Sequence, residues 1–575
     1  MNRLYTKEGR HIPETSWASY PRPQLCREDW LCLNGIWDLT VLHGKEIRRE
    51  QIRVPFCAES LLAGLKTVPE IGDVLIYRRN FTVPEHWQGR RVILHFGAVS
   101  RFAVVSVNGQ ELRIHENSYL PFSVDITEAL REDGNDLQVR VINDLTHEKP
   151  WGKQRIDRGG MWYTPCSGIW QTVWMEPVPE KHVEKLKIRC GSDWVEIRAE
   201  GVAEGTLELE GRQYGLKHGS VRIPIDSPQF WSPETPNLYE FAVTAGEDRV
   251  KSYFALRTLE IREIGGIKRL CLNGKPFFFH ALLDQGYWSD GLYTPATETG
   301  FEQDILAMKE LGFNTLRKHI KIEPEQFYYD CDRLGMIVFQ DMVNCGEYHF
   351  LRDTILPTVG VKRIGDRKLN RNPAAREGFL DAMRRTVLQL ENHPCICLWT
   401  IFNEGWGQFC ADNACRELKL LDPTRFIDST SGWFHQRESD LDSLHIYFGK
   451  LHLGKEPRAQ LLSEFGGFVW KLPEHSFNTQ KTYGYRIYSD RGSFVKALRE
   501  IYEKEILPLA EKGLCGSVYT QVSDVEDETN GLLTFDRAVR KVHPEELDDI
   551  AAKLQSAVLK QTNDTVYFFR QLSAK

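Results

Sequence analysis

The sequence predicts a multidomain protein in which two β-sandwich domains precede a C-terminal (β/α)8 barrel. The chain has 575 residues, which is too long for one hydrophobic core at roughly 100–200 residues per domain. Its first half is a succession of short strand patterns separated by turn residues. From about residue 268, short apolar runs alternate with amphipathic helical patterns, as in a (β/α)8 barrel. We therefore expect domains at residues 1–180, 181–265 and 266–575.

The first two predicted domains consist of strands. Residues 91–96 and 102–107 are apolar runs, and the Asn108-Gly109 pair after them is typical of a hairpin turn. Residues 136–141 alternate polar and apolar side chains, as an antiparallel strand with one solvated face does. Between residues 181 and 262 the strands are shorter and more polar, which fits a small second sandwich.

The third domain is predicted from its alternating elements. The expected helices cover residues 301–311, 324–334, 373–390, 409–421 and 493–507. The expected strands cover residues 313–316, 336–340, 395–401, 459–463 and 516–521. Residues 544–575 predict a helix followed by a tail.

Composition excludes several classes of protein. The net charge of −7, from 73 Lys+Arg and 80 Asp+Glu, argues against a nucleic-acid binder, which needs a basic face. No window approaches the ~18 apolar residues of a membrane span, and the N-terminus lacks the apolar core of an export signal. The thirteen cysteines form no Cys-x-x-Cys pair. Scattered thiols without an export signal predict a cytoplasmic protein.

Two carboxylates stand where a barrel places its catalytic groups, at the carboxyl ends of strands. Asn403 and Glu404 follow the strand at residues 395–401, and Glu464 follows the strand at residues 459–463. One glutamate at a strand end would be a solvated loop residue or a helix cap. The pair suits glycoside hydrolysis, in which one carboxyl is protonated and the other ionised.

The segments around these glutamates resemble glycoside hydrolase family 2, which includes β-galactosidases, β-glucuronidases and β-mannosidases. Residues 392–399, leading into Asn403-Glu404, resemble its acid/base segment, and residues 463–466 resemble its nucleophile segment. Residues 33–38, 77–81 and 168–170 resemble parts of its N-terminal domain. The resemblance covers most of the chain and implies a jelly-roll β-sandwich, an immunoglobulin-like β-sandwich and a catalytic TIM barrel, in that order.

The resemblance also implies roles for individual residues. Glu404 would be the general acid/base and Glu464 the nucleophile of a retaining mechanism, with carboxyls about 5–5.5 Å apart. Asn403 would hold the sugar 2-hydroxyl, Tyr447 would touch the nucleophile, and Arg317 would keep the nucleophile ionised. The structural alternatives are strand-end packing for Tyr447 and a surface ion pair for Arg317.

Other candidates for contact with the sugar are Asp284, Tyr287 and Trp288 after the first barrel strand, Asp341 after the third, and Trp406 beyond the acid/base. A carboxylate accepts hydrogen bonds from sugar hydroxyls, and an indole face packs against the C–H surface of a sugar ring. Each of these side chains could equally be an ordinary loop residue.

The sequence does not fix which sugar is bound. Residues 520–531 lack the Asn-x-Lys clamp of the family's β-glucuronidases and are acidic, so we expect this loop to repel a uronate. Lys318 and His319 offer another carboxylate clamp, although strand alternation argues that Arg317 and both neighbours do not all face inward. We expect an exo-acting enzyme that releases terminal β-galactosyl residues. Galactofuranosides, α-L-arabinosides, galacturonides and glucuronides stay alternatives.

The expected partner is a small carbohydrate or glycoside, with no nucleic acid and no membrane. No phosphate-binding loop or dinucleotide fingerprint is present, so no organic cofactor is expected. An acidic cluster could bind Ca²⁺ or Mg²⁺, but its spacing favours a solvated turn, and no metal is predicted; its members are Asp524, Glu526, Asp527 and Glu528. The resemblance implies a homo-oligomer, a dimer or a tetramer. The rival class is a carbohydrate-binding protein with lapsed catalysis, which would not need both glutamates.

Overall fold

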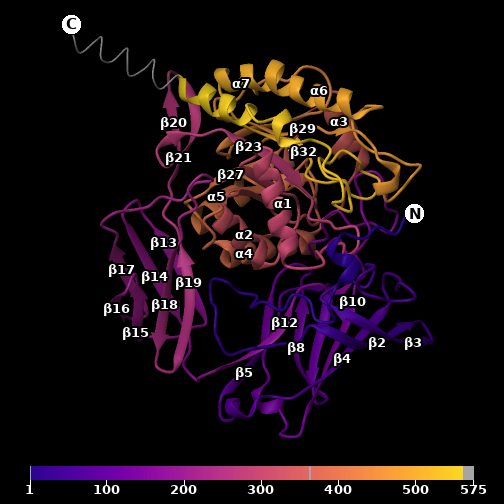
Figure 1. Cartoon of the computed structure of the whole chain (residues 1–575), viewed down its shortest axis with the longest axis vertical. Helices are drawn as coiled ribbons and strands as arrows, with labels where there is room; N and C mark the ends of the chain where they lie inside the picture. The colour runs from indigo at the N-terminus through magenta and orange to yellow at the C-terminus, as the bar shows by residue number, and fades with distance from the viewer. Residues whose placement is uncertain (1, 362–363, 561–575) are drawn as a thin grey trace.

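The fold is described from a computed structural model, which covers residues 2–361 and 364–560. Two β-regions and a helix-covered barrel follow one another along the chain, and the barrel contacts both β-regions (Figure 1). Of the segment at residues 544–575, predicted as a helix followed by a tail, residues 561–575 lie outside the described residues.

The first β-region consists of antiparallel sheets, with strand orders β3-β2-β4-β10-β7-β8 and β1-β12-β5-β9 and a small β11-β6 pair. Trp37 and Trp170 are buried in its core, where each indole N–H donates to a backbone carbonyl. The strands are β1 (Leu31–Cys32), β2 (Gly35–His43), β3 (Glu46–Val54), β4 (Val74–Phe81), β5 (Arg91–Phe96), β6 (Val99–Ser100), β7 (Phe102–Val107), β8 (Gln110–Glu116), β9 (Phe122–Asp125), β10 (Asn135–Ile142), β11 (Gly168–Ile169) and β12 (Val173–Val178).

The second β-region is a seven-stranded antiparallel arrangement, in the order β13-β14-β17-β16-β15-β18-β19, and it encloses its own hydrophobic core. Exposed and buried residues alternate along these strands, as expected when one face of a sheet is solvated. The strands are β13 (Lys185–Cys190), β14 (Trp194–Glu200), β15 (Glu204–Leu209), β16 (Arg212–Lys217), β17 (Ser220–Pro224), β18 (Tyr239–Ala245) and β19 (Asp248–Phe254).

A small sheet links this region to the barrel, formed by β20 (Leu259–Ile264), β21 (Ile267–Leu272) and β22 (Lys275–Pro276). The barrel is an eight-stranded parallel sheet in the order β27-β26-β25-β24-β23-β32-β29-β28. Its end strands meet, and the Ser443 hydroxyl donates to Asp428 Oδ1 at 2.9 Å across this seam. The strands are β23 (Phe279–Asp284), β24 (Thr315–Lys318), β25 (Ile337–Asp341), β26 (Ile396–Asn403), β27 (Phe426–Ser431), β28 (Leu441–Ile446), β29 (Ala459–Gly466) and β32 (Leu514–Thr520).

Helices surround the barrel strands, as Figure 1 shows. The helix predicted at residues 493–507 is divided by a π-helical turn, Tyr502–Ile506, and extends further than expected. The α-helices are α1 (Thr299–Glu310), α2 (Glu325–Leu334), α3 (Leu356–Thr358), α4 (Pro373–Leu390), α5 (Ala411–Leu421), α6 (Arg491–Ile501) and α7 (Leu507–Lys512). Residues 550–560 form a further helix. Two short strands, β30 (Phe468–Val469) and β31 (Arg486–Ile487), pair in the loop after β29.

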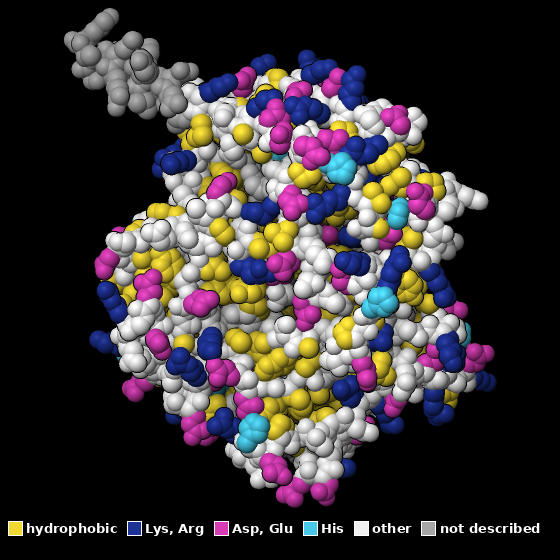
Figure 2. Space-filling model, viewed as in Figure 1, with side chains coloured by type: hydrophobic (Ala, Val, Ile, Leu, Met, Phe, Trp, Pro, Cys, Tyr) yellow, Lys and Arg dark blue, Asp and Glu magenta, His cyan; other side chains and the backbone are white. Residues whose placement is uncertain are grey.

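The surface agrees with the modest net charge. On the face drawn in Figure 2, Lys and Arg side chains lie interspersed with Asp and Glu side chains. None of the helices in the described part of the chain is long and apolar enough to cross a membrane.

Candidate active site

Glu404 stands directly after β26, at the carboxyl end of the barrel. Its backbone has a φ of 52°, in the left-handed region that is uncommon for a residue with a side chain. Two contacts hold it there: the Glu404 N–H donates to Ser431 O at 3.0 Å, and Trp433 Nε1 donates to Glu404 O at 3.0 Å. Strained backbone held by its surroundings is frequent at functional sites. The next residue is Gly405, where a Cβ would lie 2.4 Å from the Phe434 ring.

Glu464 reaches the site because β29 is irregular. The register with β28 shifts between Leu444 and His445, so that His445 stands opposite Glu464. The register with β32 shifts over the same stretch of β29. Such bulges redirect side chains and often lie beside active sites. Here the bulge directs Glu464 toward Arg317 and Tyr447.

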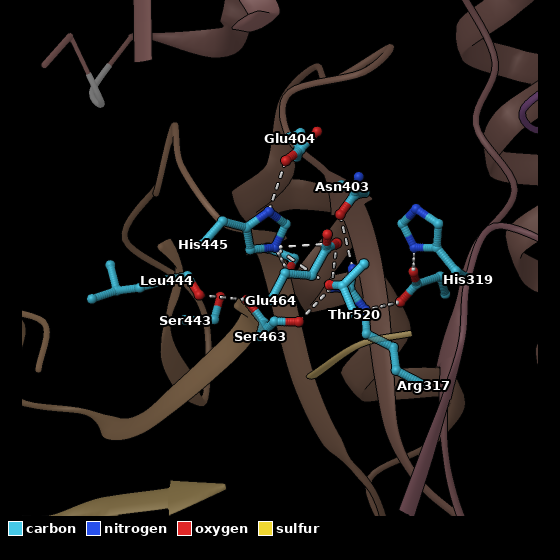
Figure 3. A network of polar contacts seen from close by, with 12 residues as sticks. Arg317, His319, Asn403, Glu404, Ser443, Leu444, His445, Ser463, Glu464 and Thr520 are labelled. Atoms are coloured by element: carbon cyan, nitrogen blue, oxygen red, sulfur yellow. Dashed lines mark hydrogen bonds and ion pairs between the residues drawn. The ribbon is translucent and has the colours of Figure 1, made fainter. Parts of the chain in front are cut away.

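The two glutamates lie close together with His445 between them, as Figure 3 shows. His445 Nδ1 is 2.8 Å from Glu404 Oε1, and His445 Nε2 is 3.5 Å from Glu464 Oε1. One oxygen of each glutamate and a histidine nitrogen all lie within 4.8 Å of one another. His445 is the contact that the sequence analysis missed. Its signal was its place two residues before Tyr447, on the same side of a strand end.

Arg317 donates hydrogen bonds to three other side chains of the site. Its Nε donates to Asp341 Oδ1 at 3.0 Å, its Nη1 donates to Glu464 Oε1 at 2.9 Å, and its Nη2 donates to Asn403 Oδ1 at 2.9 Å. The guanidinium is buried, and it donates through all three of its nitrogens. It lies within β24, rather than after the strand as the sequence analysis expects. The arrangement is an internal network and not a surface ion pair.

The environments of the two glutamates differ in a way that suits different roles. Burial opposes ionisation of Glu464, but its interactions with His445 and Arg317 overcome this and lower its pKa to about 2. Burial raises the pKa of Glu404, and the hydrogen bond with His445 only partly opposes that rise. Glu464 is therefore ionised at neutral pH, while Glu404 has the stronger tendency to hold a proton.

Tyr447 and Asn403 complete the group around the glutamates. The Tyr447 hydroxyl donates to Glu464 Oε2, and the Tyr447 ring stacks on Tyr485 with centroids 3.6 Å apart. Asn403 accepts from Arg317 through Oδ1, which leaves its amide nitrogen as the group able to donate to a ligand.

Asp341 and Trp406 lie on the same side of the barrel as this group. Asp341 accepts from Arg317 and also contacts His319 Nδ1 at 2.8 Å. Burial lowers the pKa of His319 to about 4, so this imidazole is neutral at pH 7. The His319 and Trp406 ring centroids are 6.5 Å apart, and Trp406 stacks on Trp162 of the first β-region at 5.0 Å.

Asp284, by contrast, belongs to a separate buried cluster. Lys318 Nζ lies 2.7 Å from Asp284 Oδ2 and 2.8 Å from Glu323 Oε1, and Lys321 Nζ lies 2.7 Å from Glu323 Oε2. Burial favours the neutral acid, yet the charge of Lys318 overcomes it and lowers the pKa of Asp284. The alternative clamp of Lys318 and His319 is therefore divided. Lys318 is held by carboxylates of the protein, and His319 faces the other side.

Trp288, which the sequence analysis offers either as a sugar contact or as an ordinary loop residue, is packed within the protein. The structure packs its ring against Phe301 of α1, with centroids 6.2 Å apart, and places Arg537 Cζ 4.1 Å from the ring centroid. Tyr287 likewise packs in a buried aromatic group with Tyr163 and Tyr293. The loop after β23 thus packs these rings against α1 and against the first β-region.

The acidic loop after β32 is a correction to the sequence analysis, which expects a solvated turn and an acidic rim. Its carboxylates are buried and do not form a solvated rim. Lys541 Nζ lies 2.7 Å from Asp524 Oδ1, Arg158 Nη1 lies 3.0 Å from Glu526 Oε2, and the Tyr163 hydroxyl donates to Glu528. The acidic side chains thus bind the barrel internally and to the first β-region. The predicted repulsion of a uronate by this loop loses its basis.

The connection between β10 and β11, residues 143–167, forms one wall of the site, which the sequence analysis did not predict. Trp151 Nε1 donates to Gly346 O at 3.0 Å in the loop after β25. Farther along, Trp162 stacks on Trp406, and Tyr163 and Arg158 contact the loop after β32. The signal was present as a short run rich in tryptophan and basic residues, but nothing in the sequence says which barrel loops it meets.

Within residues 2–361 and 364–560, one group of three side chains is close enough to hold a metal ion: Glu404, His445 and Glu464. This group coincides with the two glutamates that the sequence analysis assigns to catalysis, so we assign it no metal. All thirteen cysteines are free thiols, and none belongs to this group.

A parallel (β/α)8 barrel preceded by two β-regions, with two glutamates at its carboxyl end, defines a recognised class of multidomain barrel proteins. Three family models match in chain order: the glycosyl hydrolase 2 galactose-binding domain-like model at residues 48–202, the glycosyl hydrolases family 2 model at residues 185–257, and the family 2 TIM barrel model at residues 263–458. The chain belongs to glycoside hydrolase family 2.

Named relatives support the same family. A β-galactosidase of Aeromonas hydrophila is 27% identical over 477 residues, covering 73% of this chain and 43% of the relative. A β-galactosidase of Thermoanaerobacter pseudethanolicus is 26% identical, covering 56% of this chain and 44% of the relative. A protein of Formosa agariphila named putative β-glucuronidase is 23% identical, covering 63% and 34%. The chain spans less than half the length of these curated relatives.

Solved structures share the fold over nearly the whole chain. A β-D-glucuronidase of Dictyoglomus thermophilum superposes with a TM-score of 0.72 at 16% identity, covering 93% of this chain and 98% of that one. A β-galacturonidase of Eisenbergiella tayi, bound to galacturonate, has a TM-score of 0.68 at 18% identity with the same coverage. At these identities the likeness concerns the fold alone.

Proposed function

We propose that this protein is an exo-acting retaining β-glycosidase, with Glu464 as nucleophile and Glu404 as general acid/base. The observation that carries the proposal is the close pair of glutamates in opposite electrostatic environments. One oxygen of each lies within 4.8 Å of the other, which fits the spacing of about 5–5.5 Å between carboxyls in double displacement. An inverting enzyme leaves room for a water between its carboxyls and needs a wider spacing.

In the first step, a Glu464 oxygen attacks the anomeric carbon and the bond to the leaving oxygen breaks. Glu404 gives its proton to that oxygen, so the leaving group departs as an alcohol. In the second step, Glu404 takes a proton from water while the water oxygen bonds to the anomeric carbon and the ester to Glu464 breaks. Two inversions return the original configuration.

The residues around the two glutamates support these steps by binding Glu464 or by offering a hydrogen bond to the sugar. Arg317 and Tyr447 each bind one oxygen of Glu464, which fixes the carboxylate and favours its charged form. The amide nitrogen of Asn403 is free to donate to a sugar hydroxyl, and such a bond can strengthen as positive charge develops on the ring. Glu404 retains 13% of its side-chain exposure against 6% for Glu464, as a group that must reach the leaving oxygen requires.

The glycone of this proposal is a terminal β-linked sugar of galactose type. The β-galactosidases among the relatives support galactose itself, and its uronic acid stays an alternative. Residues 143–167 bear on the choice between a neutral and a charged sugar, because they bring a lysine to the site.

A stereochemical experiment tests the reaction. Aryl β-galactoside and aryl β-galacturonide would be offered to the wild type, and the first-formed sugar would be followed by proton NMR before it mutarotates. We expect the β-anomer to appear first. Glu464→Ala should lower kcat by at least about 10⁴-fold, because no covalent intermediate can form. Glu234→Ala, at an exposed glutamate of the second β-region, is the matched control. A first-formed α-anomer, or full activity in Glu464→Ala, would overturn the proposal.

A further inference from the structure

A buried lysine of the first β-region reaches the active site. Lys153 lies in the connection between β10 and β11, and only 7% of its surface is exposed. Its Nζ is 5.1 Å from the ring centroid of Tyr163 and 5.9 Å from that of Trp406. Trp406 follows the acid/base by two residues. The charge of Lys153 is felt at both Glu404 and His319, so the ammonium lies among the groups that surround the proposed sugar.

This lysine differs from the other buried lysines of the described chain. Lys318, Lys321 and Lys541 each have a carboxylate oxygen 2.7 Å away. No hydrogen bond or ion pair holds the Lys153 ammonium among residues 2–361 and 364–560. The stem of Lys153 is buried, but its Nζ is not one of the buried polar atoms that lack a partner, so the ammonium faces open space and is available to an anionic ligand. Glu404, which senses this charge, is hydrogen-bonded to His445 instead.

A second cation lies farther out on the same wall. Arg155 is half-buried, with its Cζ 4.7 Å from the ring centroid of Trp162 and 5.7 Å from that of Tyr348. The described part of the chain gives its guanidinium no carboxylate partner either. Lys153 and Arg155 are two residues apart and contact adjoining aromatic rings, since Trp162 stacks on Trp406. The nearby acidic loop cannot neutralise them, because its carboxylates bind other partners.

We propose that Lys153 binds the carboxylate of a hexuronic acid, so that the substrate is a β-linked uronide and not a neutral hexoside. Arg155, closer to the mouth, attracts the same negative charge. The inference rests on the proposed function and deepens it. A uronic acid supplies, on its own ring, an anion for this ammonium, and the resulting charge-assisted hydrogen bond is stronger than one between neutral groups. The recognition comes from the first β-region and not from the barrel loops.

The discriminating measurement is a ratio. We would measure kcat/KM for aryl β-galacturonide and β-glucuronide, and for the matching galactoside and glucoside, in the wild type. We expect one uronide to exceed its neutral counterpart by at least about 10-fold. Lys153→Met should lower that uronide-to-neutral ratio by about 10–100-fold, as expected when a hydrogen bond to a charged group is lost. Using the ratio removes any effect of Lys153 on Glu404, which acts on both substrates.

Two further variants serve as controls for Lys153→Met. Lys153→Arg keeps the charge and should restore most of the ratio. Lys149→Met removes a lysine of the same loop that is already paired with Glu116 at 3.2 Å, and it should leave the ratio at the wild-type value. Higher salt should weaken the uronide preference. A neutral hexoside preferred by the wild type, or an unchanged ratio in Lys153→Met, would overturn the inference while leaving the glycosidase proposal standing.

A binding measurement tests the inference without turnover. Galacturonate, glucuronate, galactose and glucose would be added separately to the wild type and to Lys153→Met, and the melting temperature recorded. A ligand that binds only the folded state raises that temperature. We expect a rise with a uronate in the wild type and none in Lys153→Met. Equal responses to the neutral sugars and the uronates would contradict the inference, even if no glycoside were hydrolysed.

Discussion

Two buried clusters of charge lie back to back on β24, and they are built differently. Arg317 faces one side of the strand and contacts Asp341, Glu464 and Asn403. Its neighbour Lys318 faces the other side and contacts Asp284 and Glu323. Adjacent residues on a strand point to opposite faces, so one short segment supplies the cation of both clusters.

The difference lies in the charge balance. The Lys318 cluster has two lysines and two carboxylates, so its charges cancel within the protein. The Arg317 cluster has one permanent cation for the two carboxylates Asp341 and Glu464; its His319 is neutral, and a further offsetting interaction is that of His445 with Glu464. The negative charge of Glu464 beside the anomeric carbon stabilises the positive charge of an oxocarbenium-like transition state. We call the Lys318 cluster balanced and the Arg317 cluster unbalanced in permanent charge. The balanced cluster stabilises the barrel, and the unbalanced one holds the proposed nucleophile Glu464.

The largest expected effect separates the two clusters. Arg317→Met and Lys318→Met each break buried ion pairs, so each should lower the free energy of unfolding by about 3–5 kcal/mol. Only Arg317→Met should also lower kcat per folded molecule, by about 10²–10³-fold, because Glu464 loses a charge that keeps it ionised and positioned. Urea unfolding and kinetics at a temperature where both variants are folded would measure this. Equal losses of kcat would mean that the clusters do not differ in role.

Much of the barrel, and the pair of glutamates at its carboxyl end, could be predicted from the sequence. The barrel follows from the alternation of apolar runs and helical patterns, and the two glutamates follow from their positions after strands. The strand β27, Phe426–Ser431, was not predicted, because Asp428 and three hydroxyl residues leave it without an apolar pattern although it is fully buried. Asp428 accepts from Ser443 across the barrel seam, and such pairing across elements leaves no local signal.

The contacts between domains could not be predicted from the sequence. Lys153 and Trp406 are more than 250 residues apart, and their proximity depends on how the first β-region docks on the barrel. The same docking buries Glu526 and Glu528, which local pattern reading takes for a solvated acidic turn. The bulge in β29 is also invisible locally, although it sets His445 opposite Glu464.

An intermediate effect is expected at His445, which links the two glutamates within the unbalanced cluster. Its hydrogen bond lowers the pKa of Glu404, against the larger rise caused by burial. His445→Asn therefore should raise that pKa further. The alkaline limb of kcat/KM, where activity falls as Glu404 loses its proton, should move to higher pH. The acid limb should move the same way, because Glu464 also loses an interaction that lowers its pKa. We expect kcat to fall by about 10–100-fold.

The control for His445 is His452→Asn, at an exposed histidine after the same strand, which should keep the wild-type profile. A shift of the alkaline limb to lower pH in His445→Asn would contradict the assignment, since it would mean that His445 favours the protonated form of Glu404.

The smallest expected effects come from two tryptophans with different surroundings. Trp406 lies near His319 and Lys153, on the side of the unbalanced cluster, whereas Trp288 packs under Arg537 against α1. Trp406→Phe should raise KM by about 2–10-fold, the loss expected for one aromatic contact. Trp288→Phe should lower the melting temperature by a few degrees, about 1 kcal/mol of stability, and leave KM within about twofold of the wild type. A larger rise of KM in Trp288→Phe would mean that the sugar reaches past Arg317 to the Lys318 face, and the two clusters would then share one site.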